Sequence, residues 1–212
     1  MIQIVQHNEP ANFDTDVRIP GTNFLAIVPH PSKKQFQPHK YWNRIHNDLY
    51  VLYDGICAYC ASWTPRRATP SDPNYTSVDH YIPKSKNPGL AYDWLNYRLC
   101  RARMNANKAD SLEVLDPFFI QNGWFVIDFT SFLILPNSSI EPWKASRIEK
   151  SIEILGLNDN DFVDQRLDII YSYSQETISF ADLSSTYPFI AMEMKRQDFD
   201  NNFKDDIKML SL

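Results

Sequence analysis

The 212-residue chain changes character at Asp110, and this change constrains its organisation more than any other feature of the sequence. Residues 1–110 carry 13 Lys and Arg against 9 Asp and Glu, whereas residues 111–212 carry 8 against 17. The balance is therefore +4 in the first half and −9 in the second. All five histidines and all three cysteines also lie in the first half. We expect the chemistry there, with an acidic extension behind it.

Composition and patterning exclude several classes of protein. With 43% hydrophobic and 22% charged residues, the chain has an ordinary globular composition rather than a disordered or fibrous one. No apolar run approaches the roughly 18 residues of a membrane-spanning helix, and the N-terminus lacks the pattern of a signal peptide. Three cysteines are too few for a disulfide scaffold. We therefore expect a cytoplasmic protein with reduced cysteines and no membrane association.

The predicted fold class is α+β, in three segments. Residues 1–54 are predicted to form an N-terminal arm, rich in proline and with a short strand at 24–28, followed by a helix over 40–54. Residues 55–110 form the predicted core. Within this core we predict a hairpin at 56–63, a strand at 77–82, a short helix at 88–94 and a helix at 98–108.

Residues 111–212 are predicted to begin with a β-meander and to end in helices. Asn122-Gly123 is typical of a type I′ turn between strands 118–121 and 124–129, and a third strand is predicted at 132–135. An apolar stripe predicts a helix over 145–155, with Pro142 near its first turn and Gly156 as its C-cap. Further helices are predicted from 158 to 173 and from 188 onwards.

The residues best suited to chemistry lie in the predicted core. Asp79 offers a hard anionic oxygen ligand beside the titratable imidazole of His80. Neighbouring side chains of a strand point to opposite faces, so both can serve one site only where the strand bends or ends. Pro83 is consistent with such an end. Asn96 and Asn105 add neutral amide oxygens that can bind a metal or orient another group.

Basic residues surround this constellation. Residues 33–108 carry 12 Lys and Arg against 5 Asp and Glu, a balance of +7, although the whole chain has a net charge of −5. The net charge therefore excludes only a protein that is basic all over. A carboxylate, an amide oxygen and a histidine within a basic patch suit metal-assisted hydrolysis of a phosphodiester bond. The residues expected to contact nucleic-acid phosphates are Lys84, Lys86, Arg98, Arg101, Arg103 and Lys108.

The pattern resembles the HNH, or ββα-metal, endonucleases. The resemblance rests on VDHYIPKS, LNYRL and MNANK, and the segment that carries it covers about a quarter of the chain. It implies a hairpin whose second strand carries Asp-His, followed by a helix. By position, it implies that His80 is the general base and that Asn96 orients it. It further implies that Asp79 and Asn105 hold Mg²⁺ or Mn²⁺, with Lys108 ending the motif and DNA rather than RNA as the substrate.

The chain departs from the family at the cysteines. Many members bind a structural zinc through two CxxC pairs, and Cys57 and Cys60 match the first pair. The second pair would fall at Arg101 and Met104, and Cys100 is one residue out of register, which rotates it by about 100° on a helix. A closed zinc site needs four ligands. We therefore expect these three cysteines to be packed thiols rather than zinc ligands.

A second resemblance concerns the whole chain. The segments VRIPG, FLAIV, GICAYC, DPFFI and GWFVIDF resemble those of small bacterial HNH proteins that accompany ATPases in anti-phage defence systems of the Septu or retron-linked kind. This resemblance implies an effector nuclease with an ATPase partner. We expect the acidic C-terminal half to bind that partner or to shield the basic site until the partner arrives.

Two other functions remain open from the sequence. The core could be a degenerate scaffold, in which case the protein is a non-catalytic adaptor that acts through its acidic half. Cys60, His80 and Asn96 also occur in the order of a thiol hydrolase. That interpretation leaves Asp79 without a role, and nothing resembling a nucleophile-bearing helix start surrounds Cys60.

Overall fold

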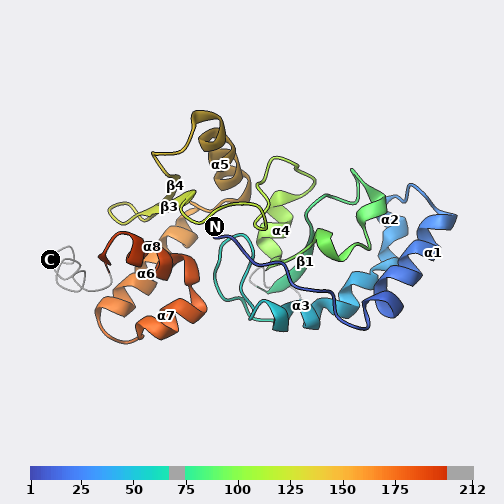
Figure 1. Cartoon of the computed structure of the whole chain (residues 1–212), viewed down its shortest axis with the longest axis horizontal. Helices are drawn as coiled ribbons and strands as arrows, with labels where there is room; N and C mark the ends of the chain where they lie inside the picture. Colours follow the sequence, from blue (N-terminus) through green and yellow to red (C-terminus); the bar gives the residue numbers. More distant parts are fainter. Residues whose placement is uncertain (67–74, 200–212) are drawn as a thin grey trace.

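Two antiparallel strands followed by a short helix lie at the centre of the molecule (Figure 1). The computed structural model describes residues 1–66 and 75–199 and confirms an α+β fold with two small antiparallel sheets. The N-terminal arm forms one end of an elongated molecule, and the C-terminal helices form the other. Among these residues, none of the helices has the length and apolar character that crossing a membrane requires.

The central unit consists of β1 (Thr76–His80), β2 (Tyr97–Arg101) and α4 (Ala102–Lys108). The two strands pair antiparallel, with Val78 opposite Leu99 in the register. Helix α4 follows β2 without a loop and packs against both strands. The unit therefore places residues of β1 beside residues of α4 that lie about 25 positions later in the chain.

Strand β2 occupies the first part of the helix predicted over 98–108, so that prediction is wrong for residues 98–101. All five residues of β2 are buried, and a segment buried on both faces has neither a helical nor a strand period to reveal it. The strand predicted at 77–82 is confirmed as β1. Asp79 and His80 lie on the first strand of the unit rather than on the second strand of a hairpin. The hairpin predicted over 56–63 is a single bridge between its end residues.

The two faces of the central sheet bury different hydrophobic clusters. Tyr97 and Leu99 pack with the N-terminal arm. Cys100 and Met104 pack with the C-terminal half of the chain. Alternate residues of a strand point to opposite faces, so this short sheet can join the two ends of the molecule.

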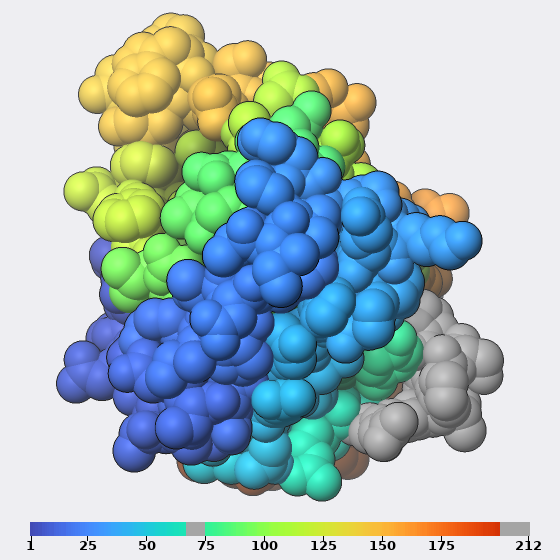
Figure 2. Space-filling model, turned by 90° about the vertical axis from the view of Figure 1, so that its right-hand side faces the viewer, coloured from blue at the N-terminus to red at the C-terminus, as the bar shows by residue number. Residues whose placement is uncertain are grey.

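The N-terminal arm is helical throughout much of its length. The strand predicted at 24–28 is wrong, because Pro20 lies in a first helical turn, where proline costs little, and Phe24 stacks on His39 at 3.9 Å between ring centroids. The helix predicted over 40–54 begins as a 3₁₀ turn. The elements are a π-helical turn (Asp14–Arg18), α1 (Ile19–Ile27), α2 (Lys33–Phe36), 3₁₀ turns (Gln37–His39 and Tyr41–Ile45) and α3 (His46–Leu52). Figure 2 shows the arm, in blue, spread across one face beside the green residues of the core.

The C-terminal half contains a two-stranded sheet rather than a meander. The strands are β3 (Phe125–Asp128) and β4 (Leu133–Pro136), and Asn122-Gly123 lies before the first of them instead of joining two strands. The strand predicted at 118–121 is absent from the structure, in which residues 117–119 form a turn. The connection at 129–132 returns the chain through Phe132, whose φ is +58°. The strands predicted at 124–129 and 132–135 are therefore confirmed as β3 and β4, whereas the strand predicted at 118–121 and its Asn-Gly hairpin turn are wrong.

The helices of the C-terminal half were largely predictable. Gly156 ends the first of them in the left-handed conformation, with φ of +65°, as the sequence predicts. The helical end predicted from 188 onwards extends into residues 200–212, which, like residues 67–74, lie outside the described residues. The described helices are α5 (Pro142–Leu155), α6 (Asn160–Ser174), α7 (Phe180–Thr186) and α8 (Pro188–Arg196).

A buried ion pair joins the central unit to the C-terminal half. The Nε and Nη2 atoms of Arg98 donate to the two carboxylate oxygens of Asp116 at 2.8 and 2.5 Å. Nη1 donates to the carbonyl oxygens of Leu95 and Tyr97, both at 2.8 Å. The side chain of Arg98 is 2% exposed. Its predicted contact with nucleic-acid phosphate is therefore wrong in this fold, because all of its nitrogens bond to protein oxygens.

Breaking this pair should destabilise the fold. Asp116→Ala should lower the free energy of unfolding by about 3–5 kcal/mol, because it leaves the Arg98 guanidinium buried without a counter-charge. Urea denaturation followed by circular dichroism measures the change. As a control, Asp110 is 66% exposed and lies 3.5 Å from Lys86 Nζ, so Asp110→Ala should cost less than about 1 kcal/mol. Equal losses in the two variants would contradict this account of Arg98.

Candidate active site

The end of β1 places Asp79 and His80 in one cleft. The strand ends at His80, as the sequence reasoning required for two neighbouring residues to share a site. The cleft has a volume of about 770 Å³, and Asn105 of α4 also lines it. Residues of the N-terminal arm form its opposite wall, among them Ser32, Lys33, Phe36, Gln37, Lys40 and Trp42.

Asp79 is held by two buried partners. Tyr59 Oη donates to Asp79 Oδ2 at 2.5 Å. Lys108 Nζ lies 3.2 Å from Oδ1 and 3.1 Å from Oδ2, and it also donates to the His80 carbonyl at 3.0 Å. The Lys108 side chain is 0% exposed, so its predicted role as a phosphate contact is wrong here. Instead, Lys108 neutralises and orients the carboxylate at the end of β1.

His80 is arranged to act as a neutral base. Its Nε2 lies 2.9 Å from the carbonyl oxygen of Ala91, which can only accept, so Nε2 carries the proton and the Nδ1 lone pair accepts a hydrogen bond from the Lys84 ammonium. Lys84 Nζ lies 3.1 Å from Nδ1. Burial, together with the charges of Lys84 and Lys108, lowers the pKa of His80 well below its usual value. The imidazole is therefore uncharged at neutral pH.

Asn96 closes the loop that follows β1. Its Oδ1 accepts from the backbone N–H of Ile82 at 2.7 Å, and its Nδ2 donates to the carbonyls of Ile82 and Leu90, both at 3.0 Å. This loop carries the carbonyl of Ala91 to which His80 bonds. Asn96 therefore does not touch His80 and can orient it only through the loop.

Asn105 presents an amide oxygen near Asp79. Its Nδ2 donates to Ser77 Oγ at 3.2 Å and to the Val78 carbonyl at 3.3 Å, which fixes the amide against β1. Within the described part of the chain, no side chain or backbone group donates to its Oδ1. A carboxylate and an amide oxygen that line one cleft fit a hard divalent ion that keeps several waters. Asp79 and Asn105 are the oxygen donors of the cleft for Mg²⁺ or Mn²⁺, and an ion bound there would share the Asp79 carboxylate with Lys108 and Tyr59.

The other predicted phosphate contacts differ in their surroundings. Lys84 lines the cleft, and Lys86 lies outside it, 3.5 Å from Asp110. Arg101 is 7% exposed and its Nε donates to Thr64 Oγ1 at 3.1 Å, so its predicted role is wrong in this fold. Arg103 is paired with carboxylates that follow α5, Asp159 and Asp161, and does not line the cleft. Neither arginine offers its charge to the site.

Several residues of the site were missed by sequence reasoning. Tyr59 follows Cys57 in the CAYC turn, and only the fold brings it to Asp79. Lys33 and Lys40 belong to the basic window over 33–108, but nothing in their local sequence separates them from solvated surface lysines. Trp42 lies beside His80, with 4.6 Å between ring centroids, and it was predicted only as a core residue.

The three cysteines are buried free thiols. Cys57 Sγ accepts from the backbone N–H of Arg101 at 3.3 Å, and Cys100 Sγ lies 3.6 Å from Ser77 Oγ. Burial raises the pKa of Cys57 and Cys100 well above the usual value, which disfavours their thiolate forms. The hydrogen bond with Cys57, helped by the charge of Arg101 and opposed by burial, lowers the pKa of Cys60 to about 6. Among residues 1–66 and 75–199, no three His, Cys, Asp or Glu side chains are grouped so that they could hold a metal ion.

Burying the charged Lys84 side chain in the site should destabilise the fold by an amount that depends on pH. Burial, helped by Lys108 and Lys40 and opposed by Asp79, lowers the pKa of Lys84 to about 8. Between that value and the ordinary one near 10.5, the unfolded chain binds more protons, so this group makes stability rise with pH. Lys84→Met should therefore be more stable than the wild type at pH 7, and the difference should shrink by pH 10.

Denaturation of both proteins by urea at the two pH values measures this difference. The exposed neighbour provides a matched control: Lys86→Met should keep the wild-type change in stability between pH 7 and pH 10. A gap between Lys84→Met and the wild type that is the same at both pH values would contradict the assignment of a perturbed lysine at this position.

Comparison with protein-family models and with curated protein sequences finds no match to this chain. The chemistry of the cleft must therefore be inferred from the residues that line it.

Proposed function

We propose that the protein is a metal-dependent endonuclease of the HNH, or ββα-metal, type that hydrolyses phosphodiester bonds, of DNA rather than RNA. One observation supports this above all. The strand–strand–helix unit brings a neutral histidine, a carboxylate and an amide oxygen into a cleft whose arm wall carries lysines. Those three groups are the ones that the family resemblance names as base and metal ligands.

His80 acts in this proposal as the general base. In the structure its Nδ1 lone pair accepts from Lys84 Nζ, and once Lys84 turns to a phosphate oxygen, Nδ1 takes a proton from the water that attacks phosphorus. A base that is neutral at pH 7 is ready for this step without first losing a proton. The carbonyl of Ala91 accepts the hydrogen bond from Nε2 and keeps the ring in the required tautomer.

Asp79 and Asn105 are the proposed ligands of Mg²⁺ or Mn²⁺. When bound, such an ion stabilises the negative charge that develops on the phosphate and on the leaving oxygen. Lys108 and Tyr59 hold the Asp79 carboxylate in place. Lys84 donates to a phosphate oxygen in this scheme, and Asn96 positions His80 through the loop.

We also propose that the protein is the effector of a defence system and binds an ATPase through its acidic half. Helix α6 supports a contact surface there, because Asp164 and Asp168 are exposed on it and form no ion pair with any described residue. Leu167 and Tyr171, exposed on the same helix by 44% and 47%, add apolar area.

The central test removes the proposed base. His80→Ala should abolish cleavage of plasmid DNA in Mg²⁺ or Mn²⁺, while the circular dichroism spectrum stays that of a folded protein. EDTA should abolish cleavage by the wild type. His30→Ala, at an exposed histidine outside the cleft, should cleave normally. Full activity of His80→Ala would overturn the proposal, and a wild type that neither binds nor cleaves DNA would favour the adaptor function.

The thiol-hydrolase alternative predicts a different pattern. Cys60 is 9% exposed, lies in the hydrophobic cluster of the C-terminal half and does not line the cleft that contains His80. Cys60→Ser should therefore cleave DNA at close to the wild-type rate in the same plasmid assay. An inactive but folded Cys60→Ser variant would contradict the nuclease mechanism.

A further inference from the structure

The active-site cleft continues into a second hollow. This hollow has a volume of about 530 Å³ and is lined by Arg66, Tyr75 and the first three residues of β1. The two hollows share Lys40, Trp42, Lys84 and Asn105. Together they form one groove, which we call the β1 groove, with Asn105 and Lys84 at the junction.

The β1 groove is longer than a single nucleotide. Thr76, Ser77 and Val78 line one hollow, whereas Asp79 and His80 line the other, so the groove follows the whole of β1. Five residues of extended strand span roughly 16 Å. DNA rises about 3.4 Å per nucleotide along its axis. A polynucleotide can therefore extend from the site along the rest of β1, over a length that a mononucleotide would not fill.

Cations of the groove wall differ from the arginines of the core in having no protein partner. Lys33 and Lys40 line the groove, and within the described ranges neither side-chain ammonium group forms an ion pair or hydrogen bond. By contrast, Arg98 and Arg103 are neutralised by carboxylates of the C-terminal half. Unpaired ammonium groups along a groove favour a bound polyanion, because each can replace a counterion of the phosphate backbone.

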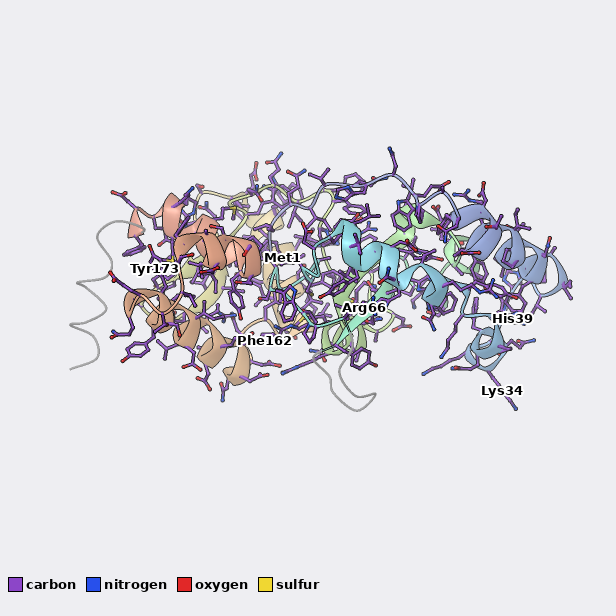
Figure 3. The ribbon with its side chains drawn as sticks, turned by 90° about the horizontal axis from the view of Figure 1, so that it is seen from below. Met1, Lys34, His39, Arg66, Phe162 and Tyr173 are labelled. Atoms are coloured by element: carbon purple, nitrogen blue, oxygen red, sulfur yellow. The ribbon has the colours of Figure 1, made fainter. Side chains whose placement is uncertain are left out.

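Arg66 supplies positive charge at the other end of the groove. Its guanidinium contacts Asn47, a neutral side chain, so its charge is not cancelled there. Arg66 lies near the middle of the molecule in Figure 3, while Lys34 and His39 mark the arm at one end. Positive charge from outside the strand–strand–helix unit therefore lines both hollows, from Lys33 in the hollow that His80 lines and from Arg66 in the other.

We propose that one strand of a DNA duplex lies along the β1 groove, with Lys33 on a phosphate in the hollow that holds His80, Lys40 on a phosphate where the two hollows meet, and Arg66 on a phosphate in the second hollow. This inference rests on the proposed nuclease function and deepens it by naming the path of the substrate. It makes the N-terminal arm a substrate-binding wall rather than a structural appendage. It also explains why cleavage is internal to a chain.

The salt dependence of binding tests the path directly. The probe is a short fluorescent DNA duplex, bound in EDTA by protein carrying His80→Ala so that no cleavage occurs. Adding Lys33→Gln, Lys40→Gln or Arg66→Gln should weaken binding and lower the slope of log affinity against log salt by about 1 for each residue. Lys34→Gln is the matched control. Lys34 lies beside Lys33 on α2, lines neither hollow and extends outward in Figure 3.

The outcomes separate this inference from the nuclease proposal. If the three groove variants keep the parent slope and affinity while the wild type cleaves plasmid, the path is wrong and the nuclease function stands. If Lys34→Gln lowers the slope as much as Lys40→Gln, general surface charge explains the binding and the path is also wrong. If the wild type neither binds the duplex nor cleaves plasmid, both proposals fail together.

Discussion

The buried ion pair between Lys108 and Asp79 is the interaction on which the rest of the site depends. Its two side chains are 0% and 3% exposed, and it connects the last turn of α4 to the end of β1. A buried pair stabilises a fold only when further hydrogen bonds satisfy its remaining atoms. Tyr59 provides such a bond to Asp79, and the His80 carbonyl provides one to Lys108. The turn at 57–60, β1 and α4 are therefore fixed relative to one another where the cleft begins.

The opposite charges of the two halves have a structural counterpart. Asp116 pairs with Arg98, and Asp159 and Asp161 pair with Arg103, so carboxylates of the acidic half neutralise arginines of the basic half. Lys33 and Lys40, which lie farther from the acidic half, keep their charge facing the groove. The net charge of −5 is thus compatible with a locally positive site, because the negative charge lies at the other end of the molecule.

Sequence reasoning succeeded where the signals are local. The apolar stripe, Pro142 and Gly156 define α5 within 15 residues of chain, and the structure confirms that helix. The sequence also placed Asp79 and His80 at a strand end, and it named Asn105 as their neighbour in the site. These positions could be predicted because each residue type has a defined chemistry and because Pro83 marks the end of the strand.

Sequence reasoning failed where tertiary contacts determine the secondary structure or the partner of a side chain. Strand β2 is buried on both faces, so its pairing with β1 rather than any periodicity makes it a strand. A basic side chain looks the same in sequence whether it faces a phosphate or a buried carboxylate. For this reason Arg98 was predicted to contact phosphate, and Lys40 was not. Tyr59 reaches Asp79 across 20 residues, and no local pattern marks that contact.

The central claim is that the strand–strand–helix unit positions the ligands of a catalytic metal ion. The metal dependence of cleavage by Asn105→Ala tests this claim most directly, because Asn105 is both hydrogen-bonded to β1 and a proposed metal ligand. Its amide is anchored on β1 by hydrogen bonds of 3.2 and 3.3 Å, and its oxygen is the part left for an ion. The account predicts that the variant needs more than about tenfold higher Mn²⁺ than the wild type for half-maximal cleavage of plasmid DNA. Identical Mn²⁺ curves for the two proteins would contradict it.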